Sequence, residues 1–313
     1  MSNTDFGSAR PGVTYDPDVL RGWGIREHNW QFSAGVQHEL LPRISVDVSY
    51  FRTWFGNFIV TDNRAVAPSD FDRFSITAPA DPRLPGGGGY TVSGLYDLKP
   101  AVFGRPANEL LTRADKYGKQ MEHWNGVDIT VNARPGSALL FQGGTNTQRR
   151  TADNCEVLTQ VPEANLLGAP YCHVQEKFLT QVKLFASYVV PRLDMQASAT
   201  FQSLPGPEIQ ANYIATNAAV SPSLGRNLAG GANNVTVNLV APGTTFGDRT
   251  NQMDIRIGKV LKFGRARATA SLDVYNVFNS STVLTLNNAY AAWLRPLTIL
   301  NPRFAKLVLQ FDF

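Results

Sequence analysis

The strongest constraint on the fold of this chain is a set of long stretches in which apolar and polar residues alternate. From Val127 to Arg134, for example, apolar residues occupy every second position and polar residues lie between them. Successive side chains of a β-strand point to opposite faces, so this period of two predicts strands with one apolar and one polar face. The sequence predicts about nine antiparallel strands of roughly 10 to 15 residues, which is long against the usual five or six.

The connections between the predicted strands alternate between tight turns and long loops. Tight turns follow Leu40, Arg134, Val190 and Lys262. Long connections cover residues 56–121, 149–174, 203–249 and 279–300. This asymmetry is typical of a transmembrane β-barrel, with short periplasmic turns and long outer loops. We therefore expect all four turns and Phe313 at one end of an all-β structure and all four loops at the other.

Ionisable side chains occur within several predicted strands, at positions on the polar face. These residues are Asp47, Asp128, Lys183, Asp254, Arg256, Arg267 and Asp273. In a barrel they would face a polar lumen. The carboxylates could then form a ladder of ion pairs with Arg256 and Arg267. We favour the simpler interpretation that they only solvate the lumen wall or contact a plug.

Large aromatic residues lie near the ends of the predicted strands, in the register of the apolar face. They are Trp30, Trp54 and Tyr188, and Phe311 and Phe313 end the chain. Aromatic girdles at both water interfaces are typical of membrane barrels. These residues therefore favour lipid contact for the apolar face.

Alternation is also compatible with a soluble or surface β-sandwich, for example a carbohydrate-binding protein with its site on the loops. In such a protein Val127, Ile129 and Val131 would point into a dry core. A barrel predicts instead that the apolar side chains are exposed. On the last strand, the side chains of Leu307, Leu309 and Phe311 should be exposed. Those of Lys306, Gln310 and Asp312 should point to the concave side.

Composition and motifs exclude several other classes. Charged residues make up 17% of the chain and the net charge is +4, with both signs scattered along the sequence, which predicts no nucleic-acid partner. The longest apolar run, Ala289 to Leu294, is far shorter than the roughly 20 residues of a transmembrane helix. The four histidines are dispersed, and no phosphate loop follows the glycines at 86–89. We therefore expect no catalytic residues, metal or cofactor, and no enzymatic activity.

The two cysteines, Cys155 and Cys172, are separated by 17 positions and have no neighbouring set of metal ligands. A zinc site is therefore not expected. In an exported chain the pair would form a disulfide, whereas in a cytosolic chain both thiols would be free. The first five residues lack the basic and apolar regions of a signal peptide.

Several motifs resemble TonB-dependent outer-membrane receptors. The ending Phe311-Asp312-Phe313 resembles the terminal aromatic signal that the barrel assembly machinery recognises. Residues 272–279 (LDVYNVFN) resemble the penultimate-strand motif of that family, and residues 251–259 (NQMDIRIGK) are similar to the strand before it. Residues 21–24, 51–58 and 223–228 resemble the Oar-like receptors, which carry a carboxypeptidase-regulatory-like domain.

The resemblance implies a place in the bacterial outer membrane and a role in transport. Residues 1–28 would be a lead-in outer loop, and residues 29–313 the C-terminal part of a barrel of about 22 strands around a plug. Such a receptor binds a scarce ligand and imports it when an inner-membrane motor displaces the plug. The implied partners are outer-membrane lipid, the energy-coupling TonB complex, the barrel assembly machinery, and the N-terminal barrel and plug of the same receptor.

No plug, energy-coupling box or signal peptide is visible in the sequence, and nine strands is an odd number for a bacterial barrel. We therefore expect the chain to be an incomplete part of a larger barrel. Its first and last strands should then fail to pair with each other.

Overall fold

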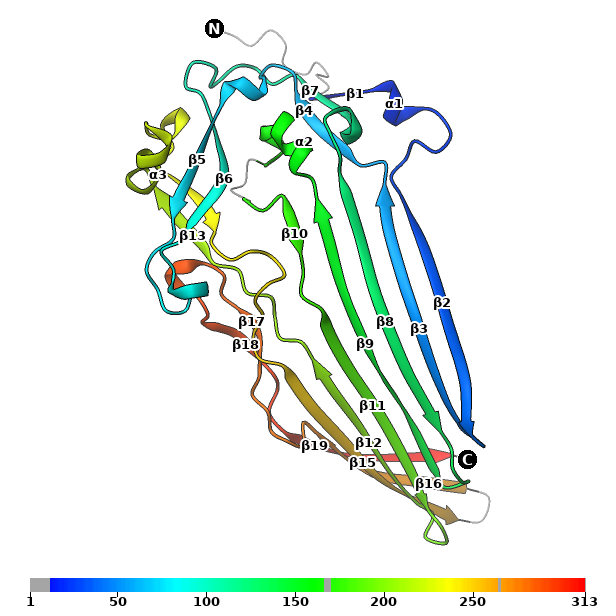
Figure 1. Ribbon diagram of the computed structural model, residues 1–313. Coiled ribbons are helices and arrows are strands. Elements are labelled where there is room, and N and C mark those ends of the chain that lie inside the picture. Colours follow the sequence, from blue (N-terminus) through cyan, green and yellow to red (C-terminus); the bar gives the residue numbers. More distant parts are fainter. Residues whose placement is uncertain (1–11, 166–169, 264–265, 313) are drawn as a thin grey trace, which may run out of the picture.

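The computed structural model describes residues 12–165, 170–263 and 266–312. Its main element is one long, curved antiparallel sheet (Figure 1). Ten strands form it: β2 (His28–Leu41), β3 (Ile44–Gly56), β8 (Met121–Ala133), β9 (Leu139–Asp153), β10 (His173–Gln175), β11 (Leu179–Val190), β12 (Met195–Leu204), β15 (Thr250–Phe263), β16 (Ala266–Tyr275) and β19 (Phe304–Asp312). The nine long strands predicted from alternation are therefore confirmed, and only the short β10 is additional.

The strands lie side by side in the order β19-β16-β15-β12-β11-β9-β8-β3-β2, and β10 pairs with the outer part of β9. Residues directly opposite each other on neighbouring strands share a face of the sheet. The register therefore places apolar side chains beside apolar ones and polar side chains beside polar ones. Val48, for example, lies opposite Val36 on β2 and Ile129 on β8. One mainly apolar face and one mainly polar face result.

The tight turns lie at one end of the sheet and the long connections at the other (Figure 1). The turns after β2, β8 and β11 are at the end where β19 finishes, because Asp312 pairs with Arg267 at the start of β16. Arg43 and Arg192 adopt the left-handed backbone, with φ of 66° and 67°, that lets two of these turns reverse within a few residues. The predicted topology is confirmed here, while Phe313 and the turn at residues 264–265 fall outside the described residues.

The long connections are folded rather than irregular. They contain small sheets of two or three strands: β1 (Val13–Tyr15) with β7 (Glu109–Arg113) and β4 (Ile59–Asn63), β5 (Phe71–Thr77) with β6 (Thr91–Leu98), β13 (Asn212–Thr216) with β14 (Asn234–Asn238), and β17 (Val283–Leu286) with β18 (Pro296–Ile299). We call the described residues of 12–27, 57–120, 154–178, 205–249 and 276–303 the cap. Residues 13–20 of the predicted lead-in loop thus belong to a folded layer.

Short helices complete the cap. The α-helices are α1 (Pro17–Leu20), α2 (Cys155–Gln160) and α3 (Asn217–Leu224). The 3-10 turns are η1 (Pro68–Asp70), η2 (Pro85–Gly87), η3 (Ala114–Lys116), η4 (Pro162–Asn165), η5 (Ala229–Gly231) and η6 (Tyr290–Ala292). None of the helices in the described ranges is long and apolar enough to cross a membrane.

The main hydrophobic core lies in the cap and not in the sheet. Its buried side chains come from three different connections, among them Phe74 and Leu95 from the first, Val220 and Val237 from the third, and Trp293 from the fourth. The Trp293 indole Nε1 donates to the Gln210 carbonyl at 2.7 Å, so its polar atom is also satisfied. The connections therefore fold together as one layer.

The sheet does not close on itself. Over the described residues β2 forms a ladder only with β3, β19 forms one only with β16, and no ladder joins β2 to β19. This confirms the expectation that the first and last strands do not pair.

Candidate functional site: a two-faced sheet beneath a folded cap

The apolar face of the sheet is exposed. Val36 on β2 is 70% exposed, Ile129 on β8 is 41% exposed, and Leu307 on β19 is 83% exposed. Large apolar patches of this extent are unusual on soluble monomers and mark an interaction surface. Because Val127 and Ile129 do not point into a dry core, the structure does not support the β-sandwich alternative.

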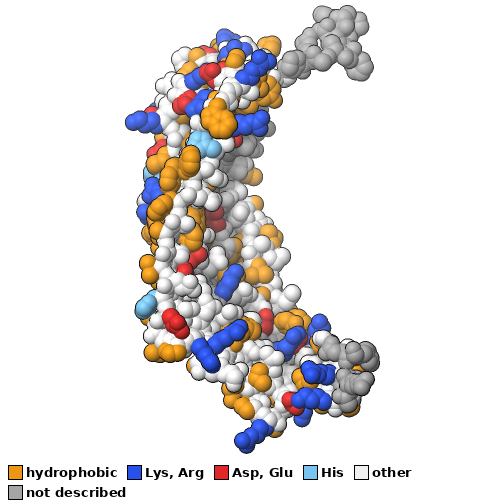
Figure 2. All heavy atoms as spheres, turned by 90° about the vertical axis from the view of Figure 1, so that its right-hand side faces the viewer, with side chains coloured by type: hydrophobic (Ala, Val, Ile, Leu, Met, Phe, Trp, Pro, Cys, Tyr) orange, Lys and Arg blue, Asp and Glu red, His pale blue; other side chains and the backbone are white. Residues whose placement is uncertain are grey.

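The edge view of the molecule shows how side-chain types are distributed along the sheet. In Figure 2 hydrophobic side chains lie along the flank of the sheet, and most lysine and arginine side chains gather toward the two ends of the molecule. The aromatic residues Trp30, Trp54 and Tyr188 are exposed, as predicted from their register. The character of the surface therefore changes along the strand direction, from basic at the ends to hydrophobic between them.

The last strand follows the predicted facing where it is described. Leu307, Leu309 and Phe311 are exposed. Lys306 lies opposite Asp273 in the register and so shares the polar face. The side chain of Asp312 and all of Phe313 lie outside the described residues, and the role of Phe311 and Phe313 as an assembly signal stays a prediction.

The polar face carries a built ion pair between neighbouring strands. The Arg256 guanidinium donates to both carboxylate oxygens of Asp273, through Nε at 2.6 Å and Nη2 at 2.7 Å. Asp273 is only 3% exposed. The interpretation that these groups merely solvate the wall is therefore wrong for this pair, since two parallel bonds fix the carboxylate. Arg267 is exposed and forms no ion pair within the described part of the chain.

The other predicted polar residues form separate local contacts. Asp254 accepts from Gln252 Nε2 at 3.0 Å and from the Asn276 backbone amide at 2.8 Å. Asp128 accepts from the Asn146 side chain on the neighbouring strand. Lys183 and Asp254 line one hollow of about 380 Å³ on this face, together with glutamine side chains of β12 and β15. The predicted set thus forms one polar wall but not a continuous ion ladder.

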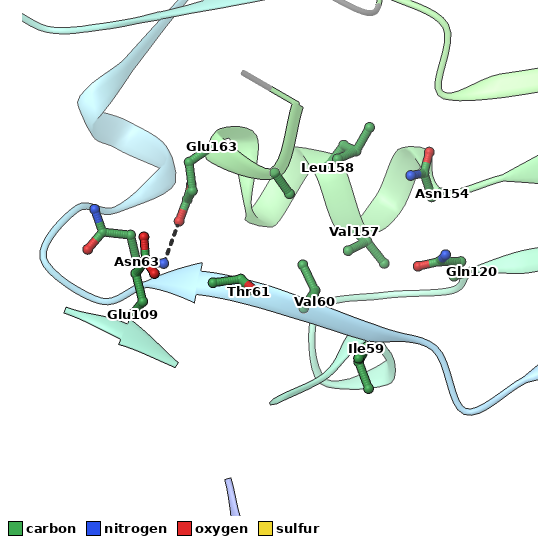
Figure 3. A pocket seen from close by; sticks show the side chains of 11 residues that line it. Ile59, Val60, Thr61, Asn63, Glu109, Gln120, Asn154, Val157, Leu158 and Glu163 are labelled. Atoms are coloured by element: carbon green, nitrogen blue, oxygen red, sulfur yellow. Dashed lines mark hydrogen bonds between the residues drawn. The ribbon is translucent and has the colours of Figure 1, made fainter. Parts of the chain in front are cut away.

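A cavity lies in the cap, between β4 and the helix α2 (Figure 3). Its volume is about 520 Å³. Apolar side chains form one part of its lining: Ile59, Val60, Val157 and Leu158. Polar side chains form the rest: Thr61, Asn63, Glu109, Gln120, Asn154 and Glu163. We call this cavity the cap pocket; its lining contains two carboxyl groups and no lysine or arginine.

A disulfide supports one wall of the cap pocket. Cys155 at the start of α2 is bonded to Cys172 just before β10, with a Cα–Cα distance of 4.8 Å. The predicted pairing is confirmed. Asn154 reinforces it, because its backbone amide donates to the Cys172 carbonyl at 3.1 Å. The bridge therefore holds α2, which supplies Val157 and Leu158, against the end of β9.

One carboxyl group of the cap pocket, that of Glu163, has a shifted pKa. Burial raises the pKa of Glu163, and the nearby Asp62 carboxylate raises it further. Glu163 Oε1 accepts from the Asn63 backbone amide at 2.9 Å, as Figure 3 shows. Tyr117 donates to Asp62 at 2.7 Å, and burial raises the pKa of the Tyr117 hydroxyl to about 12. This pocket therefore favours neutral or cationic groups over anions.

Sequence patterns did not indicate the cap pocket. Its lining comes from two long connections and has no period of two or of 3.6, so neither a strand nor a helix pattern could reveal it. The only usable signal was the cysteine pair, which predicted that the second connection is held closed.

Ion pairs lock the connections of the cap together. Arg226 in the third connection donates to Asp72 at 2.8 Å and also contacts Asp97, both in the first. Tyr290 in the fourth connection donates to Asp81 at 2.9 Å. The Arg83 guanidinium beside Asp81 holds the pKa of that carboxyl well below its usual range. The cap is therefore held by charges as well as by its apolar core.

No protein-family profile matches the chain, and no curated protein matches it. Among solved structures, the chain is similar to the ferripyoverdine receptor of the outer membrane of Pseudomonas aeruginosa (12% identity, TM-score 0.44, 91% of this chain and 26% of that one). It is also similar to the ferric-catecholate import receptor Fiu from Escherichia coli K12 (14% identity, TM-score 0.43, 91% and 27%). A third is the receptor FpvAI in complex with pyocin S2 (11% identity, TM-score 0.46, 91% and 26%).

The chain thus spans about a quarter of the length of these structures. The resemblance to the Oar-like subgroup stays a prediction.

Proposed function

We propose that this chain is a segment of an outer-membrane transport barrel of the TonB-dependent kind. Its apolar face contacts lipid, its polar face lines the passage, and its cap faces the outside and meets the ligand. Further strands pair with β2 and β19 to close the wall around a plug. The barrel works by binding and passage, driven by the TonB complex, and performs no covalent step.

The observation that supports this proposal is the position of the hydrophobic core. The cap buries its large apolar side chains, whereas the sheet exposes side chains such as Val36, Ile129 and Leu307. Water disfavours an exposed apolar face of this size, but lipid does not. The opposite face of the same strands carries the Arg256–Asp273 pair, which suits a wetted passage.

The length of the strands supports the same assignment. A strand that crosses a membrane needs about 9 to 11 residues when tilted. Each of the nine long strands has at least 9 residues and β9 has 15. The extra length on strands such as β9 lies on the cap side, so we propose that these strands extend beyond the bilayer and support the cap.

Two neighbouring positions on β2 provide a test. Val36 lies on the apolar face and Gln37 on the polar face, where it is opposite Asp47. Both side chains are exposed, so an arginine fits at either position without a clash. We expect Val36→Arg to weaken insertion into phosphatidylcholine vesicles by about 2–4 kcal/mol, the usual cost of arginine at the midplane. Gln37→Arg should insert like the unaltered chain.

The measurement is the fraction of chain that resists urea extraction after refolding into vesicles. Equal insertion of the two variants would show that the apolar face does not meet lipid and would overturn the proposal. Circular dichroism of both variants in detergent micelles controls for a general loss of folding.

A further inference from the structure

A basic cluster interrupts the apolar face of the sheet near its cap side. On three adjacent strands, Arg52, Asn125 and Arg149 lie directly opposite one another and therefore share a face. The row two residues nearer the turns on the same face is Tyr50, Val127 and Thr147. The arginines thus lie on the apolar face, about 7 Å along the strand direction from the row that contains the exposed Val127.

The height of this row matches the rim of the proposed bilayer. Arg52 lies eight positions after Ile44, where β3 begins at the turn end. At about 3.4 Å per residue and a tilt of about 40°, that is about 21 Å along the membrane normal. The apolar band of such barrels is about 25 Å tall, so Arg52 lies close to its outer boundary.

No acidic side chain within the described residues pairs with the two arginines of this cluster. Arg52 Nη1 donates to Asn125 Oδ1 at 3.2 Å, and the Arg149 guanidinium lies 4.5 Å from the centre of the Phe178 ring. Within the described ranges neither forms an ion pair, and Arg149 Nε is buried without a hydrogen-bond partner. His123 is close enough for both positive charges to act on it.

Arg150, which follows Arg149 on β9, shows how the two faces of the sheet differ. Arg150 points to the opposite face, where its Nε donates to Glu122 at 2.7 Å. On the outer face the nearest acid along β9 is Asp153, which already accepts from His173 at 2.8 Å and from the Cys155 amide at 3.0 Å. The outer face therefore keeps positive charge that the inner face neutralises.

Further groups near the arginines point to the same ligand chemistry. Exposed Phe32 lies opposite Arg52, and exposed Phe178 stacks on Arg149. Guanidinium donors beside exposed rings suit an anion that sits at the top of an apolar layer.

We infer that Arg52 and Arg149 bind the phosphate of an anionic lipid in the leaflet on the cap side. The inference rests on the proposed function, because it requires lipid against this face. Guanidinium groups bind phosphate through two parallel bonds, and phosphate is the anion that a bilayer presents at this depth. The backbones of Arg52 and Arg149 are two strand spacings apart, about 10 Å, so their long side chains can converge on one headgroup.

The test measures lipid binding to the full chain in non-ionic detergent by native mass spectrometry. Phosphatidylglycerol should bind more tightly than phosphatidylcholine. The double variant Arg52→Gln/Arg149→Gln should lose about 30-fold in affinity for phosphatidylglycerol. This corresponds to about 1 kcal/mol for each basic residue at the surface, with 1.4 kcal/mol per tenfold change.

The matched control is Arg150→Gln/Lys183→Gln, which removes two positive charges from the polar face of the same sheet. It should bind phosphatidylglycerol like the unaltered chain. Arg52→Lys/Arg149→Lys should recover only part of the binding, because the charge is kept while the paired guanidinium bonds and the stacking on Phe178 are lost. Circular dichroism in the same detergent confirms that each variant is folded.

Three results would overturn the inference. One is equal phosphatidylglycerol binding by the double variant and the control, and another is equal binding of the two lipids. The third is full competition by millimolar inorganic phosphate, which would make this a site for free phosphate. Failure of the proposed function would look different, because the unaltered chain would then not associate with phosphatidylcholine vesicles at all.

Discussion

The cap and the sheet of this molecule place their apolar side chains in opposite ways. In the cap, Ile76 is 2% exposed and Val220 is fully buried. In the sheet, Val36 and Leu307 on the two edge strands are mostly exposed, and Ile129, on the interior strand β8, is 41% exposed. One chain therefore contains a layer that folds around a core in the ordinary way and a layer whose apolar face has no protein to cover it.

This difference is what the proposed function requires, with water around the cap and lipid against the outer face of the sheet. The cap must be stable in water, so it buries apolar surface and adds ion pairs such as Arg226–Asp72. The sheet satisfies its backbone through strand pairing, and in the proposed function its outer face contacts lipid. The two regions should accordingly respond to different changes in sequence and surroundings.

The largest effect is expected for the cap core. Trp293→Ala removes a side chain that is 4% exposed and its bond to Gln210, and should lower cap stability by about 3–5 kcal/mol. Leu307→Ala on the sheet should cost less than about 0.5 kcal/mol in detergent, as surface substitutions do. Amide hydrogen exchange resolved by segment measures both. Comparable losses at the two positions would contradict the division between cap and sheet.

The disulfide should affect the cap alone. Replacing both Cys155 and Cys172 by serine releases a loop of 17 residues and should lower cap stability by about 3 kcal/mol. Limited proteolysis of α2 should become faster, whereas cleavage of the long strands should not change. If the strands became equally sensitive, the cap would not be an independent layer.

The ion pair on the polar face should contribute a smaller amount. Asp273→Asn removes the charge that holds Arg256 and should cost about 1–3 kcal/mol, the range for hydrogen bonds to charged groups. Asp128→Asn keeps the shape of a side chain that contacts only a neutral amide and should cost less. Unfolding in urea from detergent micelles compares the two, and a greater loss for Asp128→Asn would contradict this account of the polar face.

The smallest effect is a pH dependence confined to the cap. Because burial raises the pKa of Glu163, its contribution to cap stability is full at acid pH and is lost as the pH rises through the raised pKa. Glu163→Gln should remove this decline and make the cap slightly more stable at neutral pH. Asp16 acts in the opposite direction, since hydrogen bonds from Lys116 and Thr112 lower its pKa.

The ionised Asp16 should therefore stabilise the cap at neutral pH, and the unaltered chain should lose this contribution only in strong acid. Asp16→Asn should lose it already at neutral pH. Thermal unfolding of the cap between pH 4 and pH 8, followed by tryptophan fluorescence, measures both variants. A Glu163→Gln variant that keeps the original slope would show that this carboxyl is not the titrating group.

The sheet could be predicted from sequence because its information is local. A period of two fixes which face each residue occupies, so alternation placed Val127, Ile129 and Leu307 on the apolar face. That this face is exposed followed from the barrel prediction, which strand length and loop asymmetry favoured over a sandwich. The Arg256–Asp273 pair could not be assigned, because it depends on the register between β15 and β16. One residue of slip would have put other side chains opposite each other.

The cap could not be predicted because its contacts join residues far apart in the chain. Phe74, Val237 and Trp293 pack together although more than two hundred positions separate the first from the last. Each belongs to a short element with no periodic pattern, so nothing local marks it as core. The disulfide was the exception, since two cysteines leave only one possible pairing. The sequence left undecided only whether the chain is exported, where the pair would be bonded, or cytosolic, where both thiols would be free.

Contact between the outer face of the sheet and lipid is the central element of the proposed function. Ile129 and Thr130 are neighbours on β8, both exposed and on opposite faces. Each is replaced in turn by cysteine and labelled with an environment-sensitive fluorophore in phosphatidylcholine vesicles; both native cysteines are already bonded to each other. The account predicts blue-shifted emission and quenching by brominated acyl chains at position 129 and water-like emission at position 130. Water-like emission at both positions would contradict it.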